Sequence, residues 1–111
     1  MRKIPLPLRA EMANDPFYKK CCITGPTNEK IDYHHNLIYA GKQVNEVWCI
    51  LPLAESIHRD IVKYKEICNW IMCNRANDAD LLKYSKAVDY IKMRNNLNKI
   101  YGIYRKSWKL L

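Results

Sequence analysis

Several features of exported and membrane proteins are absent from this sequence. No run comes close to the roughly 18 consecutive apolar residues that a membrane-spanning helix needs. Near the start, Pro5, Pro7 and Arg9 interrupt any apolar core that a secretory signal would have. The five cysteines are an odd number, and their spacing follows no disulfide framework. We therefore expect a cytoplasmic protein with reduced thiols and no membrane partner.

Acidic residues are scarce, and none follows Asp89. The chain has 19 Lys and Arg against 11 Asp and Glu, which gives a net charge of +8 and a pI near 9.3. Such a surface attracts polyanions, and nucleic acid is the commonest of these. The alternative is that the charge only keeps a small protein from self-associating. The charge therefore favours a nucleic-acid partner without requiring one.

The length of 111 residues suits one domain, residues 1–111, with a single modest core. Residues 1–20 contain three prolines, and we expect them to form an extended arm. Residues 21–73 combine two strand patterns with a helical one. Residues 77–111 predict a long C-terminal helix with a basic tail, capped at its start by Asn77. The expected fold class is α+β.

Within residues 21–73, the first strand covers 30–35 and ends at two adjacent histidines. A loop then covers 36–46, and an apolar strand over 47–51 stops before Pro52. Apolar residues recur every three or four positions after Ser56, a plausible N-cap, so a helix is expected there. The predicted order is therefore strand, loop, strand and helix.

All three histidines of the chain, His34, His35 and His58, lie within this strand–loop–strand–helix segment. Two neutral imidazoles can hold a divalent cation while a third takes a proton from water near neutral pH. Three histidines are also an ordinary number for this length, and they could simply be strand and helix-cap residues. The order of the surrounding elements favours the first interpretation.

Three sequence pieces resemble the HNH, or ββα-metal, endonuclease family, whose small free-standing members occur in bacteria and phages. They are Cys21-Cys-Ile-Thr-Gly, then Ile31-Asp-Tyr-His-His, and then Leu51-Pro-Leu followed by His58. The resemblance covers about residues 21 to 65. It implies a β-hairpin packed on a helix around a metal site, to which the predicted C-terminal helix would be added.

The resemblance also implies a role for each histidine. His34 and His58 would be the metal ligands, and His35 would be the general base that deprotonates the attacking water. The cofactor would be one divalent ion, Mg²⁺, Mn²⁺, Ni²⁺ or Zn²⁺. Asn45 is the nearest candidate for the family's middle asparagine, which orients the base; it could equally be an exposed loop residue. Asp32 is either an extra ligand or a plain strand-edge aspartate.

Two local features complicate the comparison. Many relatives hold a structural zinc with two cysteine pairs, but here Ala54 and Ile57 occupy the helix-side positions and Cys21 and Cys22 are adjacent. We therefore expect no Cys₄ zinc. Regular strand alternation would also place neighbouring histidines on opposite faces, so both reach one site only if the strand departs from its regular pleat.

The sequence thus predicts a metal-dependent endonuclease acting on DNA, with RNA as an open alternative. A non-catalytic DNA-binding module that retains the fold is the main competing hypothesis, and a basic structural subunit with incidental histidines is the third. A double-strand break would require a homodimer or two separate nicks. Aromatic residues alternate with basic ones near the C-terminus, where the tail either contacts DNA or packs on the core. The expected DNA contacts are Lys42, Arg59, Lys63, Arg105 and Lys106.

Overall fold

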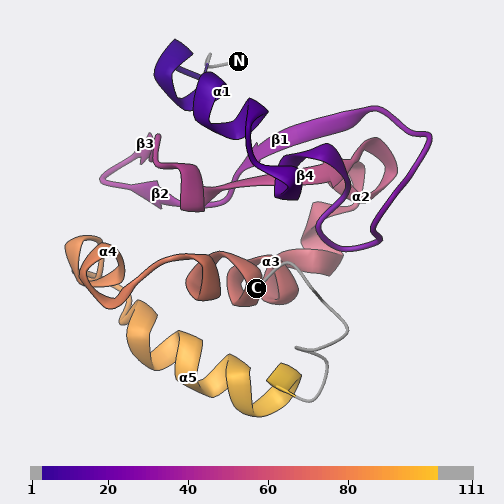
Figure 1. Ribbon diagram of the computed structural model, residues 1–111. Helices are drawn as coiled ribbons and strands as arrows, with labels where there is room; N and C mark the ends of the chain where they lie inside the picture. The colour runs from indigo at the N-terminus through magenta and orange to yellow at the C-terminus, as the bar shows by residue number, and fades with distance from the viewer. Residues whose placement is uncertain (1–3, 103–111) are drawn as a thin grey trace.

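The computed structural model describes residues 4–102 and has the expected mixed α and β composition. A ribbon of two strands lies between α1 on one side and α3 on the other, and α5 packs against α3 (Figure 1). The helices are α1 (Leu6–Ala13), α2 (Glu55–Arg59), α3 (Lys65–Arg75), α4 (Asp78–Lys83) and α5 (Tyr90–Tyr101), with 3₁₀ turns η1 (Pro16–Lys19), η2 (Val47–Cys49) and η3 (Ile61–Tyr64). The strands are β1 (Ile31–His35), β2 (Ile38–Tyr39), β3 (Lys42–Gln43) and β4 (Ile50–Ala54).

The ribbon is formed by β1 and β4, which run antiparallel from Ile31 opposite Ala54 to His35 opposite Ile50. All five residues of β4 are buried, so β4 is the strand of the pair that lies in the core. We expected the second strand at 47–51, ending before Pro52, and this was wrong. Residues 47–49 form η2, and Pro52 lies inside β4, where its carbonyl accepts a hydrogen bond of 2.9 Å from the Cys22 N–H.

The predicted loop between these strands contains a small hairpin, β2 and β3. Its turn is formed by Ala40 and Gly41, both of which have positive φ, 52° and 77°. Two successive positive φ values are typical of the tight turns that match the twist of paired strands. The hairpin shortens the connection that leads to Asn45, so this segment is more ordered than the sequence indicated.

The helix after β4 starts two residues earlier than a cap at Ser56 would give, and it is interrupted. Asp60 leaves the helical conformation, so α2 ends there and η3 and α3 follow. Ser56 is not the N-cap, a position that Ala54 occupies. Instead, the Glu29 carboxylate accepts from the Ser56 N–H and from its hydroxyl, both at 2.9 Å. A carboxylate at the first turn suits the positive end of a helix, and here it comes from the loop before β1.

Two expected segments have a different structure. Residues 1–20 contain α1 and η1 instead of an extended arm, because prolines are tolerated in the first turn of a helix. The long C-terminal helix is divided into α4 and α5. Asn77 caps α4 as predicted, but the Ser85 hydroxyl bonds back to the Leu81 carbonyl and accepts from the Tyr90 N–H. This local hydrogen bonding competes with a continuous helix.

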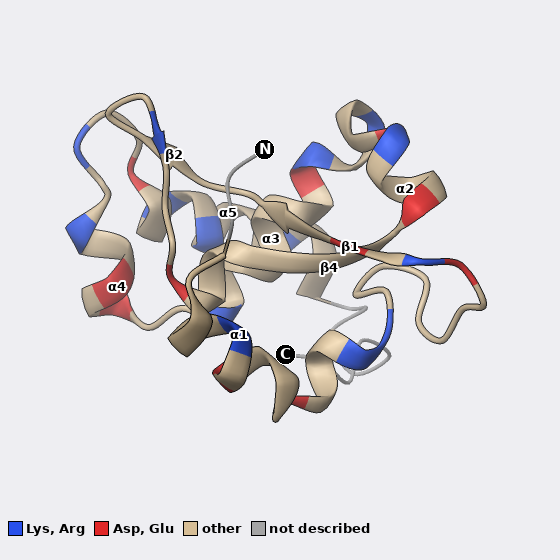
Figure 2. Cartoon of the chain, turned by 90° about the horizontal axis from the view of Figure 1, so that it is seen from above, with Lys and Arg blue, Asp and Glu red and all other residues tan. Residues whose placement is uncertain are grey.

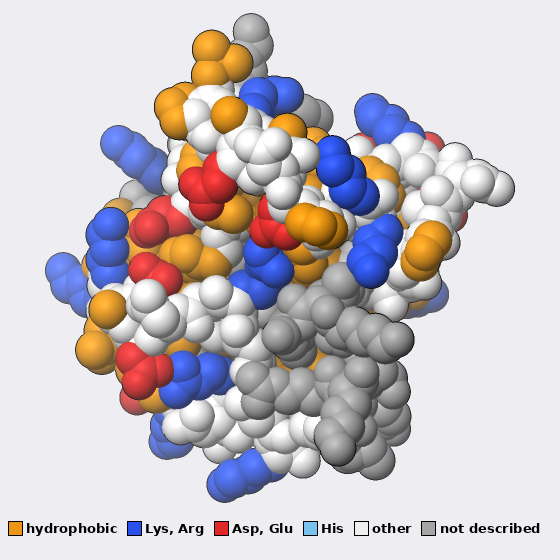
Figure 3. Space-filling model, in the orientation of Figure 1, with side chains coloured by type: hydrophobic (Ala, Val, Ile, Leu, Met, Phe, Trp, Pro, Cys, Tyr) orange, Lys and Arg blue, Asp and Glu red, His pale blue; other side chains and the backbone are white. Residues whose placement is uncertain are grey.

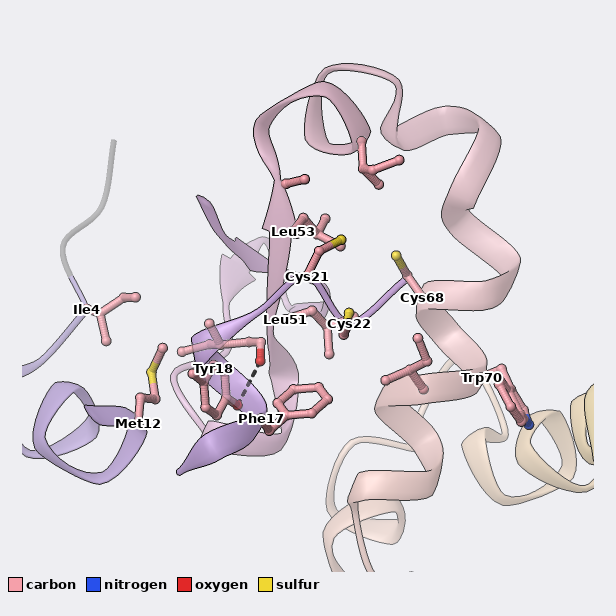
Figure 4. Packing of buried hydrophobic residues seen from close by; sticks show 14 of the residues in the cluster. Ile4, Met12, Phe17, Tyr18, Cys21, Cys22, Leu51, Leu53, Cys68 and Trp70 are labelled. Atoms are coloured by element: carbon pink, nitrogen blue, oxygen red, sulfur yellow. Dashed lines mark hydrogen bonds between the residues drawn. The ribbon is translucent and has the colours of Figure 1, made fainter. Parts of the chain in front are cut away.

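The core contains two clusters of buried side chains. One joins β4 to η1 and α3, and Figure 4 shows Cys21, Cys22 and Cys68 within it, beside Leu51 and Leu53. The other is built around Trp48 and Leu81. All five cysteines are free and buried. Burial raises the pKa of Cys68 to about 12 and that of Cys73 to about 11, so these thiols stay protonated and act as packing groups. Within residues 4–102 no helix is long and apolar enough to cross a membrane.

Candidate metal and base site

Strand β1 and helix α2 bring three of the predicted residues together. Asp32 and His34 are two residues apart on β1 and therefore lie on the same face. Because α2 follows β4 directly, it folds back beside β1 and carries His58 to that face. The His58 Nδ1 atom is 3.0 Å from Asp32 Oδ2, and the ring centres of His34 and His58 are 5.2 Å apart.

Asp32 gives His58 a defined protonation pattern. A carboxylate only accepts hydrogen bonds, so His58 donates to Asp32 through Nδ1–H, and in the neutral ring this leaves the lone pair on Nε2. An imidazole held in this way by a carboxylate is a common arrangement for a metal-binding histidine, because the carboxylate fixes the ring and raises its basicity. Asp32 is thus placed behind His58 as an orienting group.

His34 is held in its neutral form. Burial lowers the pKa of His34, and repulsion from His58 and His35 when these rings are protonated lowers it further, against the opposing effect of a hydrogen bond with Asn36. The Asn36 amide in turn donates to Asn69 Oδ1 of α3 at 3.0 Å. A neutral imidazole has the lone pair that a metal ion requires. Both histidines of this pair are therefore suited to coordination.

The other predicted pair, His35 and Asn45, is also in contact. His35 Nε2 is 2.9 Å from Asn45 Oδ1. The pairing of β1 with β4 continues without interruption to His35, so the departure from regular pleating that would place both histidines on one face is not seen. The site therefore consists of two pairs, His34 with His58 and His35 with Asn45, linked by the peptide bond between the adjacent histidines.

Partners of the site came from outside the predicted set. Asn36 and Asn69 connect His34 to α3, and Glu29 holds the start of the helix that carries His58. Hydrogen bonds from Ser56 lower the pKa of the Glu29 carboxyl, which keeps it charged as an acceptor. Only Asn36, directly after the two histidines, had a position that could have indicated a role. The contact of Glu29 with Ser56 spans 27 residues and has no local signature.

The predicted DNA contacts flank the ribbon. Lys42 is exposed on the hairpin at one end, while Arg59 and Lys63 lie on α2 and η3 at the other (Figure 2). Arg59 pairs with Glu55 at 2.7 Å, and Lys63 pairs with Asp60 at 3.6 Å. Figure 3 shows Lys and Arg spread over one face with acidic side chains between them. Arg105 and Lys106 lie outside the described residues.

The fit of a metal ion depends on the two histidines alone. Among the residues that the structure describes, no group of three or more His, Cys, Asp or Glu side chains is arranged to hold a metal. Imidazoles that share one tetrahedral ion through bonds of about 2.1 Å have ring centres about 5 Å apart. The 5.2 Å between His34 and His58 matches this value. The spacing of the two ring centres therefore allows both imidazoles to be ligands of one ion.

Comparison with known proteins found no matching protein-family model, no similar curated protein and no similar solved structure. A functional interpretation of this chain therefore depends on its own residues and their geometry.

Proposed function

We propose that this protein is a metal-dependent endonuclease that hydrolyses phosphodiester bonds of DNA. The observation that supports it is that His34 and His35, at the end of β1, each contact a partner side chain. His35 is hydrogen-bonded to Asn45, while the adjacent His34 lies against His58 and its carboxylate partner Asp32. A base and a cation site are both needed for this reaction. Here they lie on neighbouring residues, and the proposal requires that the end of β1 turns both histidines toward the same phosphate when DNA binds.

His35 is the general base. The Asn45 oxygen can only accept, so His35 donates to it through Nε2–H, and in the neutral ring Nδ1 is left with a free lone pair. A nitrogen in this state can take the proton of a water molecule that attacks phosphorus. Asn45 holds the ring in this tautomer, so its role is to orient the base.

His34 and His58 would hold the divalent ion. Such an ion, when bound, neutralises charge on the phosphate and on the leaving oxygen. His34 contributes a ring whose protonation is disfavoured by burial, and His58 contributes Nε2 because Asp32 occupies its Nδ1. The ring nitrogens and the carboxylate are thus arranged for binding rather than for proton transfer.

The basic residues at the two ends of the ribbon would contact the DNA backbone. Arg59 and Lys63 have exposed side chains close in sequence to His58, and Lys42 is exposed on the hairpin. Charges in these positions can neutralise phosphates on both sides of the histidines. A non-catalytic DNA-binding module would use the same contacts, but it would have no use for a free imidazole nitrogen on His35.

The direct test is nicking of supercoiled plasmid by the full chain with Mg²⁺, Mn²⁺, Ni²⁺ or Zn²⁺. We expect open-circular DNA with at least one of these ions and none with EDTA. Parallel assays on single-stranded DNA and on RNA define the substrate. If no ion supports cleavage of any of these substrates, the nuclease proposal is wrong.

Metal binding provides a test that is independent of cleavage. His34→Ala and His58→Ala should each abolish the binding of Mn²⁺ or Zn²⁺ measured by titration calorimetry, because each removes one of two protein ligands. Asp32→Asn should weaken binding roughly 10- to 100-fold, the usual effect of removing an outer partner of a ligand. Asp78→Asn is the matched control, since Asp78 belongs to α4 and pairs with Arg94 of α5. Wild-type affinity in both alanine variants would place the metal elsewhere.

The salt dependence of DNA binding tests the proposed contacts. The slope of log affinity against log salt should become shallower by about 0.9 for each phosphate contact removed from duplex DNA. We expect this change for Lys42→Gln, Arg59→Gln and Lys63→Gln in fluorescence anisotropy titrations. Lys99→Gln, on α5 and exposed, should keep the wild-type slope. If Lys42→Gln, Arg59→Gln and Lys63→Gln all keep the wild-type slope, as Lys99→Gln should, DNA binds on a different face.

A further inference from the structure

Asn45 is an exposed residue in a short connection, and its side-chain hydrogen bond is with the His35 ring that it orients. The backbone is held on either side of it. The Val44 N–H donates to the Leu37 carbonyl at 3.0 Å, and the Glu46 carbonyl accepts from the Cys49 N–H at 2.9 Å. The orientation of the Asn45 amide therefore depends on how firmly this connection, residues 44–46, is fixed.

The side chain of Glu46 ties the connection to α4. Its carboxylate accepts a hydrogen bond from the hydroxyl of Tyr84, the C-cap residue of α4, and lies 3.5 Å from Lys83 Nζ. The Tyr84 hydrogen bond and the charge of Lys83 lower the pKa of the Glu46 carboxyl, so it is ionised at neutral pH. A charged acceptor makes a stronger hydrogen bond than a neutral one. We refer to Glu46, Lys83 and Tyr84 as the Glu46 clamp.

The ring of Tyr84 is itself fixed by aromatic side chains from both flanks of the connection. Tyr39 of β2 meets it edge-on at 5.2 Å between ring centres, and Trp48 of η2 packs at 5.8 Å. Both views of the ribbon place α4 at the same end as the hairpin (Figures 1 and 2). The packing of these two rings against Tyr84 therefore fixes the position of the hydroxyl that donates to Glu46.

We propose that Glu46 and Tyr84 are positioning residues for the base: by fixing the connection that carries Asn45, they keep His35 in the tautomer with Nε2 protonated and Nδ1 free. The role as a base rests on the proposed nuclease function, whereas the tautomer is a property of the folded protein in the absence of metal and DNA. The clamp also gives α4, which lies beyond the segment that resembles the nuclease family, a part in the site.

The tautomer of His35 can be measured by long-range ¹H–¹⁵N correlation NMR of the ring nitrogens in the metal-free full chain. We expect one tautomer in the wild type. Tyr84→Phe keeps the packed ring but removes the hydrogen bond, and it should produce a mixture of tautomers. Tyr101→Phe is the matched control, because the Tyr101 hydroxyl donates to Glu66 at 2.7 Å far along α5 and α3. It should leave the His35 signals unchanged.

A second pair of variants separates orientation from folding. Glu46→Ala should mix the tautomers in the same way, and Glu46→Gln should restore the wild-type state, because an amide oxygen still accepts from Tyr84. In the nicking assay, Tyr84→Phe and Glu46→Ala should each cleave roughly 10-fold more slowly with unchanged DNA affinity. This is the usual size of the loss when a residue that supports a site residue from outside is replaced.

The outcomes distinguish the two proposals. A single wild-type tautomer in both Tyr84→Phe and Glu46→Ala would overturn the positioning role, whatever the nicking activity. Mixed tautomers in these variants, together with a wild-type protein that cleaves no nucleic acid, would support the positioning of His35 and reject the nuclease function. If Tyr84→Phe does not fold, the comparison of Glu46→Ala with Glu46→Gln decides the matter.

Discussion

Replacing His35 with alanine is expected to reduce plasmid nicking by roughly 10²–10⁴-fold, the usual contribution of a positioned general base. The physical reason is the free Nδ1 that the hydrogen bond to Asn45 leaves available. Metal binding should persist because His34 and His58 are unchanged, and most DNA affinity should persist because no basic residue is removed. The measurement is the single-turnover rate of conversion of supercoiled to open-circular plasmid, at matched metal and protein concentrations.

Asn45→Ala serves as the graded comparison for this variant. It leaves the base in place but removes the group that orients it, so its loss of rate should be smaller than that of His35→Ala. Circular dichroism of both variants checks the fold. Wild-type cleavage by His35→Ala would remove this residue from the mechanism and transfer the role of base to another group.

Replacing Trp70 with alanine is expected to lower the free energy of unfolding by about 3–5 kcal/mol, as for other large buried aromatics. Trp70 is fully buried in α3, packs against the ring of Tyr101 at 5.2 Å, and donates from its indole nitrogen to Asn98 Oδ1 at 2.8 Å. It therefore joins α3 to α5. Urea denaturation followed by circular dichroism measures the loss.

Two further variants calibrate this prediction. Trp70→Phe retains most of the apolar volume but loses the hydrogen bond to Asn98, so its effect should be smaller, and it remains measurable if Trp70→Ala does not fold. Leu82→Ala, at a side chain that is 65% exposed, should change stability by less than about 0.5 kcal/mol. A loss of less than about 1 kcal/mol in Trp70→Ala would show that the contact between α3 and α5 contributes little.

The stability of α3 also bears on the candidate site. Asn69, next to Trp70, accepts the hydrogen bond from Asn36, which is the residue after His35. The end of β1 is thus attached to α3, while Glu46 attaches the connection before η2 to α4. These two attachments place the helices that follow the ribbon in contact with both flanks of the histidine pairs. Helices α3 to α5 therefore support the site without supplying its candidate ligands or base.

The amino-acid sequence alone determined the features that depend on neighbouring residues. The strand ending at His34 and His35, a helix following the second strand and the cap at Asn77 were predicted correctly, although the helix cap is Ala54 and not Ser56. Each follows from alternation, helical spacing or a side chain that bonds its own backbone three residues away. The α+β class follows from the same local patterns.

Only the tertiary structure decided which side chains meet. The contact of Asp32 with His58 spans 26 residues, and that of Glu46 with Tyr84 spans 38. Neither is encoded by a local pattern, because each depends on the register of β1 with β4 and on the break between α4 and α5. The break itself escaped prediction because Ser85 bonds back to the backbone where apolar spacing favoured a continuous helix. Periodicity specifies which face of an element is buried, whereas the partner of a polar side chain is chosen by the packing of whole elements.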